Sequence, residues 1–219
     1  MELSEKVLEL LFPPKCILCR KVLPDGIRAV CPICRKDLPR IKASRISFEQ
    51  EFFSLCVSPF YYDGALRQAV LKYKFLGHAS YAPSFGHLLS ACVREELDGR
   101  WDILSWVPLS AQRLKERGYD QTRLLAGALA KELGCPLVPT LEKHRHVPPQ
   151  SKLKSKELRR ANICDAFRVP DPAAVQGRRI LLIDDIITTG STLSECARVL
   201  RYAGAQEVVC ATLVRSPNA

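Results

Sequence analysis

The stretch that decides the fold is residues 178–203, which read RRILLIDDIITTGSTLSECARVLRYA. The apolar run at residues 180–183 predicts a short strand that is buried on both faces of a sheet. The helix expected after it has apolar residues at i, i+3, i+4 and i+7, namely Leu193, Cys196, Ala197 and Leu200. Because residues 207–214 read as a further strand, the stretch predicts a right-handed strand–helix–strand crossover in a parallel sheet.

The loop between this strand and this helix has the chemistry of a phosphate cradle. Gly190 has no Cβ, so the backbone can approach a ligand closely there. The first N–H groups of the helix lack partners within it, and they attract anions together with the helix dipole. Hydroxyl donors surround the glycine, at Thr188, Thr189, Ser191 and Thr192. No lysine follows Gly190, which excludes the P-loop that binds nucleoside triphosphates.

Two carboxylates, Asp184 and Asp185, directly precede the cradle. They repel phosphate, but they suit sugar hydroxyls or a metal ion. A ribose 5-phosphate, with a phosphate at one end and a vicinal diol at the other, fits both halves. The stretch resembles the motif with which type I phosphoribosyltransferases bind phosphoribosyl pyrophosphate (PRPP). The alternative is a generic α/β crossover with aspartates at a strand end, as in receiver domains.

The composition is that of a basic globular protein. The chain has 219 residues, 47% hydrophobic and 26% charged, with a formal net charge of +10. That length accommodates one α/β domain and a small appendage. A positive charge suits an enzyme that handles polyphosphates, and it equally suits a partner of nucleic acid. The charge alone does not separate these two interpretations.

Residues 1–11 predict a short amphipathic helix and not an export signal. They carry Glu2, Glu5 and Glu9 and lack the basic start of a signal peptide. No stretch of the chain approaches the length and apolarity of a transmembrane span. We therefore expect a cytoplasmic protein, whose ten cysteines serve in metal binding and in the core and not in disulfides.

A pair of C-x2-C knuckles follows the expected helix. Its cysteines are Cys16, Cys19, Cys31 and Cys34, with eleven residues between the two knuckles. Four thiolates at this spacing predict a closed, tetrahedral, structural zinc site, and an iron–sulfur cluster is the alternative. Basic residues surround the site, as a nucleic-acid face or as an ordinary solvated surface: Lys15, Arg20, Lys21, Arg28, Arg35, Lys36, Arg40, Lys42 and Arg45.

We expect two domains, a helix with a four-cysteine zinc-binding unit at residues 1–45 and a larger α/β domain at residues 52–219. The larger domain is predicted to contain further strands at residues 55–61, 101–107 and 136–141. Its expected helices are at residues 65–75 and 81–97 and after residue 121. The last of these is expected to bury Leu124, Leu125, Ala128 and Leu129. The other cysteines, Cys56, Cys92, Cys135, Cys164, Cys196 and Cys210, mostly fall in apolar segments and are interpreted as core residues.

Basic side chains on two further segments predict contacts with a pyrophosphate. In the phosphoribosyltransferase architecture that the sequence resembles, an early strand leads into a loop that contacts the pyrophosphate, and residues 109–113 stand in that place. Arg113, Lys115 and Arg117 add positive charge nearby. The long hydrophilic segment at residues 142–167 contains Arg145 and is interpreted as a lid that excludes water. The alternatives are a solvated helix edge and a mobile surface loop.

Taken together, these segments resemble the ComF family of competence proteins over nearly the whole chain. The specific matches are VPLSAQRLKERGYDQTRLLAGALA at residues 107–130 and LLIDDIITTGSTL at residues 181–193. The resemblance implies a type I phosphoribosyltransferase fold, a mostly parallel sheet flanked by helices, with an N-terminal zinc finger. It also implies a bacterial cytoplasmic protein linked to DNA uptake and natural transformation. The sequence departs from the family pattern at Asp120, where asparagine is usual, and at Val147, where serine or threonine is common.

The same resemblance implies roles for individual residues. Asp184 and Asp185 are then the catalytic-site carboxylates that hold the ribose hydroxyls, directly or through Mg²⁺, and residues 188–192 hold the 5′-phosphate. Arg117 lies near the pyrophosphate, and the lid carries Arg145, Gln150, Arg159 and Asn162.

Two functions follow as alternatives. The first is phosphoribosyl transfer from PRPP, bound with Mg²⁺, to an unknown acceptor. The second is a non-catalytic competence module with PRPP or a nucleotide as effector, which contacts single-stranded DNA or recombination proteins. Few aromatic residues lie among the basic runs, which counts against a dedicated single-strand binder.

Overall fold

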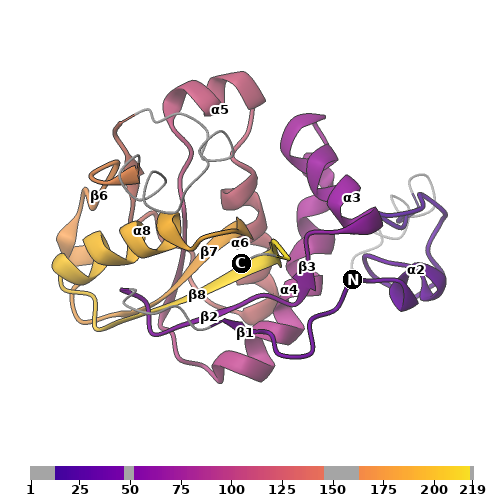
Figure 1. Cartoon of the computed structure of the whole chain (residues 1–219), viewed down its shortest axis with the longest axis horizontal. Helices are drawn as coiled ribbons and strands as arrows, with labels where there is room; N and C mark the ends of the chain where they lie inside the picture. Colours follow the sequence, from indigo (N-terminus) through magenta and orange to yellow (C-terminus); the bar gives the residue numbers. More distant parts are fainter. Residues whose placement is uncertain (1–12, 47–51, 146–162, 218–219) are drawn as a thin grey trace, which may run out of the picture.

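The computed structural model describes residues 13–46, 52–145 and 163–217, and its centre is a six-stranded sheet (Figure 1). The strand order is β1-β2-β8-β7-β4, and β3 also pairs with β8. In chain order these strands are β1 (Arg45–Ile46), β2 (Leu55–Val57), β3 (Phe60–Tyr61), β4 (Ile103–Trp106), β7 (Arg179–Ile187) and β8 (Glu207–Arg215). All pairs among them are parallel except β1 with β2, which confirms the expected mostly parallel sheet.

Helices cover both faces of the sheet. The helices of the described residues are, in chain order, α2 (Pro32–Lys36), α3 (Gly64–Phe75), η1 (Ala79–Tyr81), α4 (Ala82–Leu97), α5 (Ala111–Arg117), α6 (Gln121–Leu133), η3 (Pro172–Ala174) and α8 (Ser191–Tyr202). Helix α8 packs on one face, together with a small hairpin of β5 (Glu142–Lys143) and β6 (Phe167–Arg168), and α4 and α6 pack on the other (Figure 1). Successive residues of β7 alternate between the two cores, since Leu181 and Ile183 face the α4 and α6 side and Leu182 the α8 side.

Strand β7 is longer than the sequence indicates. The apolar run predicts a strand at residues 180–183 with both aspartates beyond its end, but the strand continues to Ile187. The cause is β8, which stays paired alongside: Asp184 lies opposite Thr212, and Ile187 opposite Arg215. The two aspartates are therefore strand residues, which decides where their side chains point.

Two other predicted strands are wrong in their extent. The segment at residues 55–61 is divided into β2 and β3, because Pro59 has no N–H to donate to a neighbouring strand. The segment at residues 136–141 forms only an isolated bridge between Leu104 and Leu137. The extended hydrogen bonding that follows it belongs to β5, in the separate hairpin.

Helix α6 presents a different face to the core than the sequence predicts. Its Leu125 and Leu129 are fully buried as expected, but Leu124 is 37% exposed and Ala126 is fully buried in its place. The helix starts where the sequence predicts, because Asp120 caps it by accepting a hydrogen bond from the Arg123 N–H at 3.0 Å. In this orientation about its own axis, α6 packs against α4, and Gly86 of α4 lies directly over Ala128.

Most of the cysteines outside the two C-x2-C knuckles lie in the core, as the sequence indicates. All ten lie among the described residues, and none forms a disulfide. Cys56, Cys92, Cys196 and Cys210 are buried core residues, as expected. Cys135 is half-buried and packs against the core, and Cys164 is exposed and is not a core residue.

Residues 13–46 pack against α3 and α4, the first two α-helices of the larger domain. Seven of their buried apolar side chains belong to the same core cluster as α3 and α4: Cys16, Ile17, Leu23, Ala29, Val30, Cys31 and Leu38. Arg20 donates a 3.0 Å hydrogen bond to the Tyr81 hydroxyl and lies over its ring. Figure 1 shows this N-terminal segment beside α3. The division at residues 45 and 52 stays a prediction.

Some expectations fall on residues that the structure does not describe. They include the helix over residues 1–11, Val147, and the lid residues Gln150, Arg159 and Asn162. Among the helices within residues 13–46, 52–145 and 163–217, none combines the length and apolarity that a membrane crossing requires.

Candidate functional site

The end of β7 and the start of α8 enclose a small pocket. Its lining is continuous in sequence except for one residue: Asp184, Ile186, Ile187, Thr188, Thr189, Gly190, Ser191, Thr192 and Leu193. The predicted cradle, residues 188–192, therefore forms one wall of a single concave site. The residue that the lining omits is Asp185.

Gly190 gives the cradle its shape. It caps α8 in the left-handed conformation, with φ of 76°, which a residue with a Cβ rarely adopts. Its carbonyl accepts the Ser194 N–H at 2.8 Å, so the helix begins at once and its first N–H groups are directed towards the pocket. The Thr189 and Ser191 hydroxyls are hydrogen-bonded to each other at 2.9 Å, so one donates to the other and the second O–H is left to point at a ligand. This arrangement is suited to an anion with several oxygens.

Asp184 and Asp185 lie on opposite faces of the sheet. Asp184 lines the cradle pocket and has the same strand parity as Leu182, on the α8 side. Asp185 has the parity of Ile183 and extends towards α3 and α6. The structure thus brings Asp184 to residues 188–192 but does not bring the Asp185 carboxylate there. The Asp185 backbone N–H donates a hydrogen bond to Asp184 Oδ1 at 2.8 Å.

Each oxygen of Asp185 has a partner within the protein. Lys74 Nζ lies 2.8 Å from Oδ1, and Gln121 Nε2 donates to Oδ2 at 3.0 Å. The side chain of Asp185 is only 6% exposed and that of Lys74 16%. Burial favours the protonated acid, but attraction by Lys74 and the hydrogen bonds outweigh it, so the pKa of Asp185 is lowered. Asp185 is therefore an ionised carboxylate with an internal counter-ion.

Asp184 has the opposite electrostatic character. Burial, and then repulsion by the neighbouring Asp185 charge, raise its pKa to about 7. A carboxyl group that changes charge near neutral pH at the edge of a pocket is a common feature of functional sites. A divalent cation or a ligand N–H or O–H donor would favour the ionised form. Both aspartates offer the hard oxygen ligands that Mg²⁺ prefers, and Asp184 is the one that lines the pocket.

Basic side chains gather around the same edge of the sheet. Burial, and then the nearby charge of Arg117, lower the pKa of Arg113. Lys143 of β5 has its pKa lowered to about 8, first by burial and then by Arg113. Arg117 lies over the Phe75 ring at 4.8 Å, and its Nη1 is buried without a hydrogen-bond partner. A cluster of cations that lower one another's pKa is suited to a polyphosphate.

The segment predicted as the pyrophosphate loop is mostly helical. Ser110 caps α5, whose first residue is Ala111, so Arg113 and Arg117 project from a helix and not from a loop. The open connection that follows β4 is shorter than residues 109–113 suggest. Arg145, the predicted lid residue, is exposed and donates a hydrogen bond to the Cys164 carbonyl, near the β5–β6 hairpin.

The four predicted metal ligands come together. The sulfur atoms of Cys16, Cys19, Cys31 and Cys34 all lie within 4.8 Å of one another. Each knuckle is closed by the same backbone hydrogen bond, from Arg20 N–H to Cys16 O and from Arg35 N–H to Cys31 O, both at 2.9 Å. Four converging thiols leave no ligand position for water, which fits a structural ion.

A second group of possible ligands is better explained as an ion-pair network. Cys164, Asp165 and Glu195 also lie close together. Arg198 bridges the two carboxylates, at 2.9 Å from Asp165 and 2.8 Å from Glu195. Both carboxylates are thus already paired with a cation of the protein.

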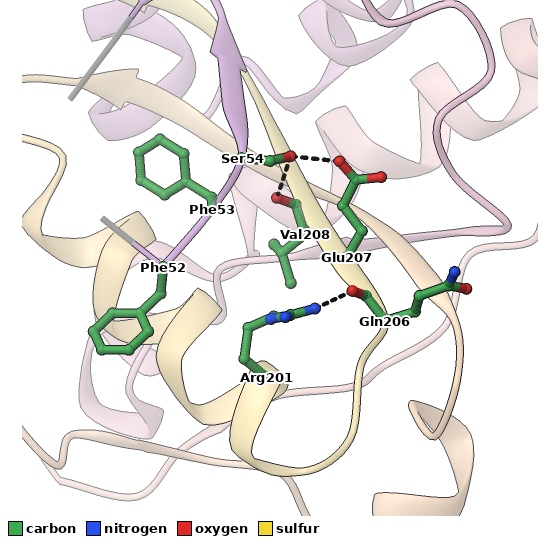
Figure 2. Close-up of a pocket in the computed structure, with 7 residues that line it drawn as sticks. All are labelled: Phe52, Phe53, Ser54, Arg201, Gln206, Glu207 and Val208. Carbon is green, nitrogen blue, oxygen red and sulfur yellow. Dashed lines mark hydrogen bonds between the residues drawn. The ribbon is translucent and has the colours of Figure 1, made fainter. Parts of the chain in front are cut away.

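Figure 2 shows a further pocket, of about 410 Å³, at the opposite edge of the sheet. It is lined by Phe52, Phe53, Ser54, Arg201, Gln206, Glu207 and Val208. Its polar groups bond to one another, because Ser54 donates to Glu207 at 2.6 Å and Arg201 donates to the Gln206 carbonyl. It therefore presents few free groups to a ligand.

Comparisons with known proteins agree with this geometry. Residues 7–45 match the double zinc ribbon domain, and residues 122–219 match the phosphoribosyl transferase domain. The chain is 32% identical to competence protein ComFC of Bacillus subtilis, over 92% of this chain and 78% of that protein. It is 30% identical to the DNA utilization protein YhgH of Salmonella typhi, over 93% of this chain and all of that protein.

The chain belongs to the ComF family. Its larger part has the phosphoribosyltransferase type I fold, and its N-terminal cysteines form the metal site of a double zinc ribbon. Among solved structures, it is similar to the glutamine PRPP amidotransferase of B. subtilis, with a TM-score of 0.44 and 23% identity over 65% of this chain and 30% of that chain.

One residue that departs from the ComF pattern has a structural role here. Asp120 accepts the Arg123 N–H at the start of α6, and its other oxygen lies 3.4 Å from the Leu109 N–H. Burial raises the pKa of Asp120 in spite of these bonds. The carboxylate thus caps a helix and secures the end of the β4 connection.

Lys74, Gln121 and Lys143 are the site residues that the sequence did not single out for a role. Lys74 is recognisable there only as a basic residue near a helix end, and Gln121 only as the start of a helix. No spacing rule connects either residue with Asp185, because their contact depends on how α3 and α6 pack against β7.

Proposed function

We propose that this ComF-family chain binds PRPP at the cradle pocket and is a phosphoribosyltransferase for an acceptor still to be found. The observation that carries the proposal is the continuous pocket formed by Asp184 and residues 186–193. It combines a carboxylate, paired hydroxyls and helix N–H groups in the order that a ribose 5-phosphate requires. The family membership and the phosphoribosyl transferase domain support the same ligand class.

In this proposal the chain contributes binding and charge stabilisation. Residues 188–192 hold the 5′-phosphate, and Asp184 holds a ribose hydroxyl. Arg113, Arg117 and Lys143 face the pyrophosphate and stabilise the charge that develops as it leaves. Mg²⁺, when bound with PRPP, neutralises the pyrophosphate.

Calorimetric titration of PRPP in the presence of Mg²⁺ tests the binding. We expect binding by the wild-type chain and an affinity loss of about tenfold or more in Asp184→Asn. The matched control is Asp102→Asn, because Asp102 pairs with Arg179 at the opposite end of β7. Absence of wild-type binding, or equal losses in both variants, would contradict the proposal. Pyrophosphate release with a panel of nitrogen acceptors then separates transfer from binding alone.

A second function is favoured by the surface of the zinc ribbon. Its basic side chains are exposed within residues 13–46, among them Lys15, Lys21, Arg35 and Lys36. They lie beside exposed apolar side chains, since Ile33 is 69% and Val22 55% exposed. Two relatives are named as a competence protein and a DNA utilization protein. The alternative is therefore a module in which the ribbon contacts single-stranded DNA and the cradle binds an effector.

Salt dependence of DNA binding tests this alternative. Neutralising Arg35 and Lys36 should weaken binding to a single-stranded oligonucleotide and reduce the slope of affinity against salt. Asp184→Asn should leave it unchanged. A slope that is the same in the wild type and in the doubly neutralised variant would contradict a role for the ribbon in DNA contact.

A further inference from the structure

The ion pair between Lys74 and Asp185 lies directly beside Asp184, the carboxylate that lines the cradle pocket. Lys74 comes from the last turn of α3, and Asp185 from β7, 111 residues further along the chain. Lys74 bonds one oxygen of Asp185 and Gln121 bonds the other. A divalent cation that approached Asp185 would compete with the Lys74 ammonium for the same carboxylate charge.

Of the two partners, Lys74 is the one that can leave. Gln121 is the first residue of α6 and carries no charge, and it is only 3% exposed, so its side chain is enclosed by the core. Lys74 is attached through a flexible four-carbon stem at a helix end. Part of the Lys74 side chain reaches solvent, since it is 16% exposed against 6% for Asp185.

The charges around the pair make the release of Lys74 depend on an anion. Arg117 lies near enough to Asp185 to help lower the pKa of that carboxyl, and Arg113 also senses the charge of Asp185. An ammonium group that leaves Asp185 enters the field of these guanidinium groups, which repel it. A polyphosphate bound there reverses the field and favours the released position.

We propose that Lys74 is an exchangeable counter-ion, which competes with a divalent cation for Asp185 in the free protein and contributes its charge to the ligand polyphosphate once it is released. This rests on the proposed function, and it goes further because it assigns a role to a residue outside the cradle. It also explains how the chain keeps a charged, buried carboxylate stable before ligand binds, since an unpaired one is costly. Lys74 acts in this view as a positioning residue for Asp185 and as an added phosphate contact.

The test compares Lys74→Gln with Lys72→Gln, in which the same charge is lost two residues away on the same helix. Mg²⁺ alone, titrated by calorimetry, should bind Lys74→Gln about tenfold more tightly than the wild type, because the competing cation is gone. PRPP, titrated at saturating Mg²⁺, should bind the same variant about tenfold more weakly, because a phosphate contact is lost. Lys72→Gln should shift neither affinity.

A residue with only a structural role would not move the two affinities in opposite directions. Unchanged or weaker Mg²⁺ binding by Lys74→Gln overturns the counter-ion, and unchanged PRPP binding overturns the phosphate contact. If Lys74→Gln does not fold, Lys74→Arg decides: the guanidinium grips the carboxylate with two hydrogen bonds, so Mg²⁺ affinity should fall below that of the wild type. If the wild type binds no PRPP, the proposed function fails, and the Mg²⁺ titration still tests the counter-ion by itself.

Discussion

Asp184 and Asp185 show how neighbouring identical residues acquire different chemistry. Their side chains leave β7 on opposite faces, so one meets the cradle and the other meets Lys74 and Gln121. Burial acts on both, but only Asp185 has a cation in contact. The pKa of Asp184 therefore rises and that of Asp185 falls, which assigns the permanent charge to Asp185 and the titrating group to Asp184.

This difference predicts a pH dependence of stability. Asp184 has a folded-state pKa of about 7 against an ordinary value of 3.8, so the folded state binds its proton more tightly. Its stabilising effect is fully present below pH 4 and is lost as the pH rises towards 7. Urea unfolding of the wild type and of Asp184→Asn should show the wild type losing stability relative to the variant, on the order of 2 kcal/mol, across this range. Parallel pH profiles of the two proteins would contradict the elevated pKa.

Helices α4 and α6 pack so closely that one position admits only glycine. A Cβ at Gly86 would lie 2.7 Å from Ala128 Cβ and 2.9 Å from the backbone of α6. Neither neighbour is the end of a flexible side chain, so the helices themselves would have to separate. Gly127 is on the same helix as Ala128, but a Cβ there would meet Leu137 at 3.7 Å, an ordinary contact, and no atom of α4.

The two glycines form a matched pair for measuring this packing. Gly86→Ala should destabilise the protein by about 1–3 kcal/mol, because it overpacks the contact between α4 and α6. Gly127→Ala should be neutral or stabilise by up to about 1 kcal/mol, because alanine is the better helix former. Denaturant unfolding measures both. Equal effects of the two substitutions would show that the close approach of the helices does not limit stability.

Among the secondary-structure elements, the sequence predicts the bounds of the helices better than the ends of the strands. The expected helices at residues 65–75 and 81–97 correspond closely to α3 and α4. Periodicity and caps are local, so the sequence contains them. The end of β7 depends on how long β8 remains beside it, and the division of residues 55–61 on how Pro59 meets β8, and both are relations between distant segments.

In the whole molecule, the zinc ribbon and the phosphoribosyltransferase-type part share a core. The ribbon residues Ile17, Leu23 and Val30 are buried in the same cluster as α3 and α4. From the ribbon, Arg20 bonds Tyr81, whose ring meets Phe85 edge-on at 6.0 Å, and Phe85 in turn meets Tyr73 at 5.2 Å. Tyr73 immediately precedes Lys74, so a chain of side-chain contacts connects the ribbon with the helix that carries Lys74.

Removal of the metal should therefore destabilise residues beyond the ribbon. Chelation leaves the four thiols without an ion to hold them, and a unit of this size retains little structure without its metal. We expect faster amide hydrogen exchange in residues 13–46 and also in α3 and α4, with a lower melting temperature. Re-addition of zinc should restore both. Faster exchange confined to residues 13–46 would show that the shared core transmits no stability.

The sequence by itself determined the crossover around residues 178–214, the cradle at residues 188–192 and the four-cysteine site. Each of these is written in spacing along one short segment, where backbone geometry leaves few alternatives. Only the tertiary structure decided that Asp185 faces away from the cradle, that Lys74 and Gln121 hold it, and that the ribbon shares the core of α3 and α4. These depend on strand pairing and helix packing between residues far apart in the chain, such as the 111 positions that separate Lys74 from Asp185.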